Sequence, residues 1–194
     1  TGGYLYFHKA PDSIEFDKEC KRLLKDLHYF DVLRSDRCIA SHGLEARTPF
    51  LDKNFVTTYL SVPLELRNHN LQNNCEKYLL RKSFENSGFL PNEVLYRTKE
   101  AFSDGVSKQT KSWYEIIQEH LEDKKINCYE LHEHNQPTTK EQYYYREIFD
   151  QKYPNSQYVI PYFWMPKFVN ATDSSARTLD IYKKKSNETI NEVL

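Results

Sequence analysis

Residues 11–43 read PDSIEFDKECKRLLKDLHYFDVLRSDRCIASHG and carry a clear helical signal. Asp12 and Glu15 stand three residues apart, which is the spacing of a capping signal at the start of a helix. The apolar positions that follow are Leu23, Leu24, Leu27, Phe30, Leu33 and Ile39. Their spacing is that of one face of an α-helix, and Gly43 is a typical residue to end such a run. The stretch therefore predicts one long or kinked helix.

Two shorter helices are predicted between Asp52 and Gly88. Asp52 immediately precedes a helical run that stops before Pro63, so it can cap the first helix. Asn73 and Glu76 can cap the second, which would end before Gly88. This part of the chain is therefore expected to be helical as well.

Two further helices are predicted in the second half of the chain. WYEIIQEHLED, residues 113–123, places its apolar side chains in helical register. Thr138 and Glu141 form a capping signal for the stretch KEQYYYREIFDQKY, residues 140–153. No segment shows the alternation of strands and helices that is typical of an open α/β sheet, so the pattern alone predicts a helical module.

The length and composition fit one domain or part of one. The 194 residues are 39% hydrophobic and 14% aromatic, which is enough for a single core of ordinary size. From residue 155 onward the sequence is aromatic but aperiodic, which is typical of an ordered irregular extension. We therefore predict a helical part at 1–154 and, at 155–194, an irregular extension with a frayed tail.

Charge and cysteine usage exclude several classes of partner. The net charge is −1, with 27 basic and 28 acidic residues, so no global field favours nucleic acid or a membrane surface. The four cysteines show neither a CxxC pair nor metal-ligand spacing, and no signal-peptide core or long apolar stretch is present. These features predict a cytoplasmic protein, without a visible metal-ligand set.

Residues 96–105 read YRTKEAFSDG and place four charged residues in a run without periodicity. Those residues are Arg97, Lys99, Glu100 and Asp104. Taken alone, Lys99 would most simply be a solvated surface charge paired with Glu100 or Asp104, because most lysines are exposed. A functional alternative is that an aperiodic loop aims this long side chain into a cleft.

Five stretches together carry a family resemblance over nearly the whole chain. They read GGYLYFHKAP, GLEARTPFLD, RTKEAFSDGV, TTKEQYYYREIF and YFWMPKFVNATDSSARTL. In their order and spacing they resemble the last part of the glutamine-hydrolysing asparagine synthetases. The resemblance implies the helical C-terminal half of an α/β ATP pyrophosphatase domain of the adenine nucleotide α-hydrolase type. Most of the parallel sheet of that domain would come from upstream sequence.

The resemblance also implies a reaction. In this family an N-terminal glutaminase domain releases ammonia from glutamine, and the synthetase domain uses ATP with Mg²⁺ to adenylate aspartate. Ammonia then attacks β-aspartyl-AMP. The family's Ser-Gly-Gly-x-Asp-Ser loop and Gly-Glu-Gly-x-Asp-Glu segment would lie before Gly2. We therefore expect the chain to need an N-terminal portion of the same protein, and to be inactive alone.

The resemblance assigns catalytic roles to three residues of this sequence. Lys99 matches the family's phosphate-binding lysine, placed where negative charge grows as pyrophosphate leaves. Asp31 and Arg34 match positions that line the nucleotide side of the synthetase cleft. Without the resemblance, their spacing of three favours an ordinary ion pair on a helix surface.

Four more residues are candidates for ordering the substrate cleft, namely Glu45, Arg47, Glu100 and Asp104. For Glu45 and Arg47 the alternative is a pair that braces a turn. Two alternatives for the whole protein also stay open at this point. One is another ATP pyrophosphatase amide ligase, such as a β-lactam synthetase, in which Lys99 would keep its role. The other is a non-catalytic helical interaction module.

Overall fold

The computed structural model describes residues 9–72, 75–97, 111 and 113–169. The chain divides into two units: Thr1–Lys99 with Pro166–Asn170, and Glu100–Met165 with Ala171–Leu194. The predicted boundary between residues 154 and 155 stays a prediction.

Helices provide the regular structure of the described residues, in which no β-strand is formed. The first unit contains α1 (Ser13–Asp26), α2 (Asp31–Ala40), α3 (Lys53–Ser61), α4 (Leu64–Arg67), α5 (Tyr78–Phe84) and α6 (Asn92–Leu95). It also contains the 3-10 helices η2 (Leu27–Tyr29), η3 (Pro49–Leu51) and η4 (His69–Leu71). The second unit contains α8 (Trp113–Glu122), α9 (Lys140–Lys152) and η5 (Gln157–Val159). The predominantly helical character predicted from sequence is confirmed for these residues.

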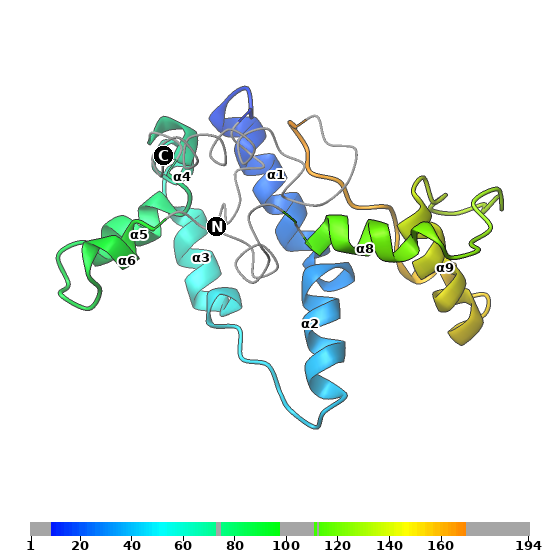
Figure 1. Cartoon of the computed structure of the whole chain (residues 1–194). Coiled ribbons are helices and arrows are strands. Elements are labelled where there is room, and N and C mark those ends of the chain that lie inside the picture. The colour runs from blue at the N-terminus through cyan, green and yellow to red at the C-terminus, as the bar shows by residue number, and fades with distance from the viewer. Residues whose placement is uncertain (1–8, 73–74, 98–110, 112, 170–194) are drawn as a thin grey trace, which may run out of the picture. The chain divides into compact units, whose positions relative to one another are not determined.

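The predicted long helix is kinked rather than continuous. Its start is confirmed, because the Asp12 carboxylate accepts a hydrogen bond of 2.8 Å from the backbone N–H of Glu15. Helix α1 passes through η2 into α2 in Figure 1, and Phe30 interrupts the helical dihedrals between them with φ −124° and ψ −95°. After α2 the chain turns at Gly43, whose φ of +70° favours glycine.

The caps of α3 and α5 differ in how well the sequence predicted them. Asp52 caps α3 as predicted, because its carboxylate accepts from the backbone N–H groups of Asn54 and Phe55. The predicted capping role of Glu76 is wrong. Helix α5 begins at Tyr78, after Lys77, which has a left-handed φ of 59°, so Glu76 lies before the helix rather than in its first turn. Asn73, the other predicted cap, lies outside the described residues.

The N-terminus of α9 lies one residue beyond the predicted cap. Thr139, not Thr138, is the N-cap, and its hydroxyl accepts from the backbone N–H of Gln142 at 3.3 Å. The side-chain carbonyl of Gln142 reaches back and accepts from the backbone N–H of Thr138 at 2.8 Å. Thr139 and Gln142, three residues apart, form this reciprocal capping arrangement. The predicted pair, Thr138 and Glu141, has the same spacing but lies one residue earlier.

A buried ion pair joins α1 to α4 in the first unit. The guanidinium of Arg67 lies 2.7 Å from the carboxylate of Asp17, and their side chains are 3% and 9% exposed. Arg67 also donates to the carbonyl of Val62 at 2.9 Å. Next to the pair, the ring of Phe16 meets that of His69 edge-on at 5.4 Å. Helix α1 therefore meets α4 and η4 through both a charge pair and an aromatic contact.

Burial and charge act in opposite directions on Asp17. Burial alone would raise the pKa of its carboxyl group, but hydrogen bonds and charge from Lys21 and Arg67 outweigh burial, so the pKa lies below its ordinary value. The stabilisation from this group is thus present above the ordinary pKa and is lost as the pH falls through the lowered one. Burial raises the pKa of Cys20 to about 11 and that of Tyr59 to about 12, which keeps both groups neutral near pH 7.

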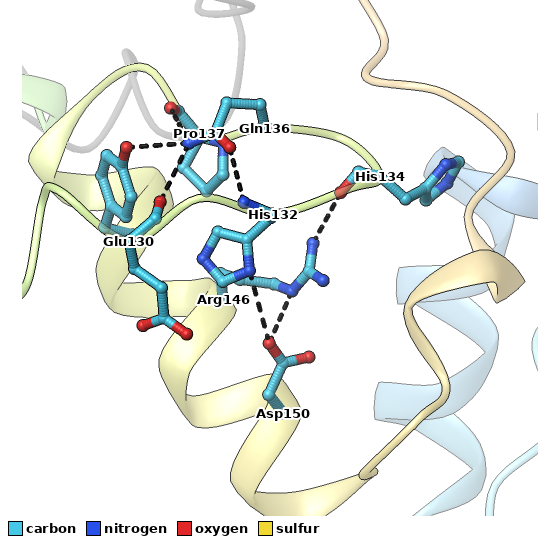
Figure 2. A network of polar contacts seen from close by, with 8 residues as sticks. Glu130, His132, His134, Gln136, Pro137, Arg146 and Asp150 are labelled. Atoms are coloured by element: carbon cyan, nitrogen blue, oxygen red, sulfur yellow. Dashed lines mark hydrogen bonds and ion pairs between the residues drawn. The ribbon is translucent and has the colours of Figure 1, made fainter.

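In the second unit, α8 packs against α9 and an arginine holds the loop that precedes α9. Arg146 bonds the carboxylate of Asp150 at 2.7 Å and donates to the carbonyl of His134 at 2.9 Å (Figure 2). His134 and Asn135 in turn contact the carbonyl of Ile160, at 2.7 and 3.0 Å. The beginning of the predicted irregular extension is therefore ordered by polar contacts with this loop.

Among the described residues, no helix combines the length and the apolarity that a transmembrane span requires.

We expect Arg67→Met to loosen α1 in the full-length protein. Removing one partner of a buried ion pair typically costs about 3–5 kcal/mol, because the other charge stays buried without compensation. Hydrogen exchange measured by mass spectrometry should then show protection of α1 amides reduced by roughly 100-fold or more.

Lys21→Ala is the matched control, because Lys21 is the exposed partner of the same carboxylate, at 2.7 Å. An exposed pair contributes little, so this variant should change α1 protection by less than about fivefold. Similar losses in both variants would contradict the importance of the Asp17–Arg67 pair.

Candidate functional site

Asp31 and Arg34 form an exposed ion pair at the start of α2. Arg34 donates to the Asp31 carboxylate at 2.9 Å, and the two side chains are 79% and 80% exposed. Their neighbours Val32 and Leu33 are half-buried, so the apolar face of α2 turns inward while the charged pair faces outward. The spacing of three thus brings the two side chains together, as the sequence predicted.

Glu45 and Arg47 form a second exposed pair in the loop between α2 and α3. Their side chains approach to 3.2 Å and are 76% and 82% exposed. Both residues lie in the irregular segment between Gly43 and η3. The pair thus joins two positions within one loop. Whether it also orders a substrate stays a prediction.

Lys99, Glu100 and Asp104 lie outside the described residues. The structure does describe the chain that leads to them. Helix α6 ends at Leu95, whose side chain is buried, and Tyr96 and Arg97 follow it. The backbone N–H of Arg97 donates to the carbonyl of Val94 at 3.4 Å. The approach to Lys99 is therefore ordered up to Arg97.

An open apolar groove lies between α1, η2, α2, η3 and α3. Its volume is about 500 Å³. Six aliphatic side chains line it, namely Leu24, Leu27, Val32, Leu51, Val56 and Leu60. Lys21, Lys25 and His28 complete the lining. None of the described candidate site residues lines this groove.

The sequence analysis missed this groove, although part of its signal was visible. Leu24 and Leu27 belong to the helical apolar pattern of residues 11–43. That pattern predicts an apolar face but not the elements that it meets, because those elements are distant in sequence. The groove therefore appears only when α3 is placed beside α1 and α2.

In the part of the chain that the structure describes, no group of three His, Cys, Asp or Glu side chains comes together to bind a metal ion.

Comparison with known proteins identifies the family. A family model described as Asparagine synthase matches residues 5–173. The Asparagine synthetase [glutamine-hydrolyzing] of Gallus gallus is 52% identical over 194 aligned residues, which cover 97% of this chain and 34% of the chicken protein. The proteins of the same name from Homo sapiens and Cricetulus griseus are 49% and 50% identical, each over 94% of this chain and 33% of their own length.

The chain thus spans about a third of the length of these relatives. The family model nevertheless covers most of the chain, from the segment before α1 to beyond the end of the described residues. The matched range includes both exposed ion pairs, Asp31–Arg34 and Glu45–Arg47, and also Lys99. The chain therefore belongs to the asparagine synthase family.

Proposed function

We propose that the protein carrying this chain makes asparagine from aspartate, ATP and ammonia derived from glutamine. The supporting observation is the identity of 49–52%, over nearly the whole chain, with proteins named Asparagine synthetase [glutamine-hydrolyzing]. In this proposal, ATP first converts aspartate to β-aspartyl-AMP, and ammonia then displaces AMP. The shared name favours this reaction over that of a β-lactam synthetase or a non-catalytic module.

In this proposal the chain forms the helical C-terminal half of an α/β ATP pyrophosphatase domain. Helices that cover a sheet turn apolar faces toward it. The open groove between α1 and α3 presents apolar surface of this kind, and the loop residues Leu44 and Phe89 add exposed apolar side chains. We therefore assign the sheet and the glutaminase to another part of the same protein, which would be the principal partner of these faces.

The proposed location is the cytoplasm. Cys20, Cys38, Cys75 and Cys128 are all free thiols in the structure. Free thiols are typical of proteins from reducing compartments.

Lys99 is the proposed phosphate-binding residue. Adenylation of aspartate moves negative charge onto the leaving pyrophosphate, and a cation placed there in advance stabilises the transition state more than the ground state. We propose that Mg²⁺ accompanies ATP in the complete protein, where it would neutralise phosphate charge. Within the described residues, no three His, Cys, Asp or Glu side chains come together to hold this ion.

Asp31 and Arg34 are proposed to face the nucleotide. A guanidinium carries five N–H donors, so the contact with Asp31 leaves donors for a phosphate. The exposure of both side chains fits this role, because a ligand must be able to reach them. Arg34 would bind phosphate or orient Asp31, and Asp31 would act in proton transfer or in organising a cation. Glu45, Arg47, Glu100 and Asp104 are proposed to order the substrate cleft.

We expect Lys99→Ala in the full-length protein to lower adenylation by roughly 100-fold to 1000-fold, as is typical for loss of one preorganised group that stabilises a transition state. Isotope exchange between pyrophosphate and ATP, at saturating aspartate, measures this step without ammonia. Lys99→Arg should restore only part of the rate, because a planar guanidinium does not reproduce a compact ammonium. Exchange near the wild-type rate in Lys99→Ala would refute the proposed role.

Arg34→Leu should weaken asparagine synthesis while glutamine hydrolysis persists, because the two half-reactions are assigned to separate domains. The melting temperature should stay within about 1 °C of the wild-type value, since an exposed ion pair contributes little to stability. Arg37→Leu is the matched control, as Arg37 lies one turn further along α2 and is 77% exposed. Equal losses in both half-reactions would indicate misfolding and contradict a specific role for Arg34.

A further inference from the structure

Arg81 of α5 is a nearly buried arginine whose contacts converge on the chain that leads to Lys99. Its side chain is 11% exposed. Nε donates to the carbonyl of Glu76 at 2.8 Å, and Nη2 lies 3.7 Å from the carboxylate of the same residue. Nη1 donates to the carbonyl of Leu95. One guanidinium therefore links the segment before α5 to the last residue of α6.

The carbonyl of Leu95 is a group that needs such a donor. It is one of the last carbonyls of α6, and the final carbonyls of a helix have no partner within the helix. The side chain of Leu95 is itself buried. The main chain is thus held at this residue by apolar packing on one side and by a charged donor on the other.

A second contact holds the next residue. The hydroxyl of Tyr96 donates to the carboxylate of Glu85 at 2.7 Å, and Lys82 also pairs with Glu85. Arg81 and Glu85 stand four residues apart, so they occupy neighbouring positions on one face of the helix that includes α5. Leu95 and Tyr96 are therefore both fixed to the same helix, α5, and to its C-cap.

These contacts lie close to Lys99 along the chain. Lys99 follows Leu95 by four residues, and a fully extended chain of that length spans at most about 14 Å. Catalytic rates respond strongly to a displacement of about 1 Å in a reacting group. The end of α6 is thus held four residues before Lys99, the residue proposed to act in adenylation.

Stability alone does not account for a charged residue at this position. Apolar side chains of similar volume often replace a buried ion pair without loss of stability. An apolar side chain cannot, however, bind a chosen carbonyl oxygen in a defined direction. The guanidinium of Arg81 adds this directional hold on Leu95.

We propose that Arg81, supported by Glu85, is a positioning residue for Lys99 in the adenylation step. Arg81 touches neither substrate nor phosphate in this proposal, and acts by fixing the end of α6. The inference rests on the proposed function, because it requires Lys99 to act in adenylation. It adds a residue that the resemblance did not assign.

The test is a double-mutant cycle in the full-length protein, read by pyrophosphate–ATP exchange. Arg81→Met alone should slow exchange by roughly 10-fold to 100-fold, while glutamine hydrolysis stays within about twofold of wild type. Introduced into Lys99→Ala, the same change should slow exchange by less than about threefold, because residues that act through one another are not additive. Arg81→Lys, which keeps the charge and N–H donors but loses the planar fork of the guanidinium, should recover a part of the rate.

A matched control separates positioning from loss of an ion pair. Arg22→Met also deletes an arginine that pairs with a buried glutamate, since Arg22 bonds Glu19 at 2.6 and 2.7 Å on α1. Its loss should leave exchange within about threefold of the wild-type rate. If Arg22→Met and Arg81→Met slow exchange equally, the inference fails.

The remaining outcomes also decide the matter. Multiplicative losses in the Arg81 and Lys99 cycle, or unchanged exchange in Arg81→Met, overturn the inference while leaving the proposed function intact. Unchanged exchange in Lys99→Ala would instead overturn the proposed role of Lys99. If Arg81→Met does not accumulate as folded protein, Tyr96→Phe decides, because it deletes only the exposed bond to Glu85. Tyr96→Phe should slow exchange several-fold, again with little further effect in Lys99→Ala.

Discussion

The first unit depends on the buried charge pair between Asp17 and Arg67. Each partner is compensated further, Asp17 by Lys21 and Arg67 by the carbonyl of Val62. A pair of this kind tolerates little displacement, because either charge would be strongly destabilised if left alone in the interior. It therefore fixes how α1 meets α4. Helix α1 lines the groove that it forms with α3 and leads through η2 into α2. The position of α1, which this pair fixes, therefore affects both features.

Sequence patterns predicted the local parts of this fold and missed the parts that depend on distant residues. Asp12 and Asp52 cap helices as predicted, because a cap needs only the next three residues. At Phe30 and at Lys77 the backbone leaves the helical conformation, although the local sequence does not mark these positions as breaks. Tertiary packing can override local helix propensity in this way. The Asp17–Arg67 pair could not be predicted, since nothing in the sequence states which carboxylate a remote arginine will meet.

The candidate site divides in the same way. The contact between Asp31 and Arg34 follows from helical spacing, whereas their proposed role came from the family resemblance alone. Arg81 escaped the sequence analysis for a physical reason. Two of its acceptors are backbone carbonyls, and every residue carries a carbonyl, so no residue type marks the partner. Such positioning contacts become visible only in three dimensions.

Five of the described arginines fall into two distinct settings. Arg67, Arg81 and Arg146 each combine a carboxylate with a backbone carbonyl, and their side chains are largely buried. In each case the carbonyl belongs to an irregular segment or to a helix end, where backbone groups lack regular partners. Arg34 and Arg47 instead pair with a carboxylate two or three residues away and stay exposed. Buried arginines order the loops, and exposed ones keep the donors that an anionic ligand requires. That distinction supports a structural use of the first group, whereas exposure alone, which Arg37 shares, leaves the ligand-facing use of Arg34 a proposal.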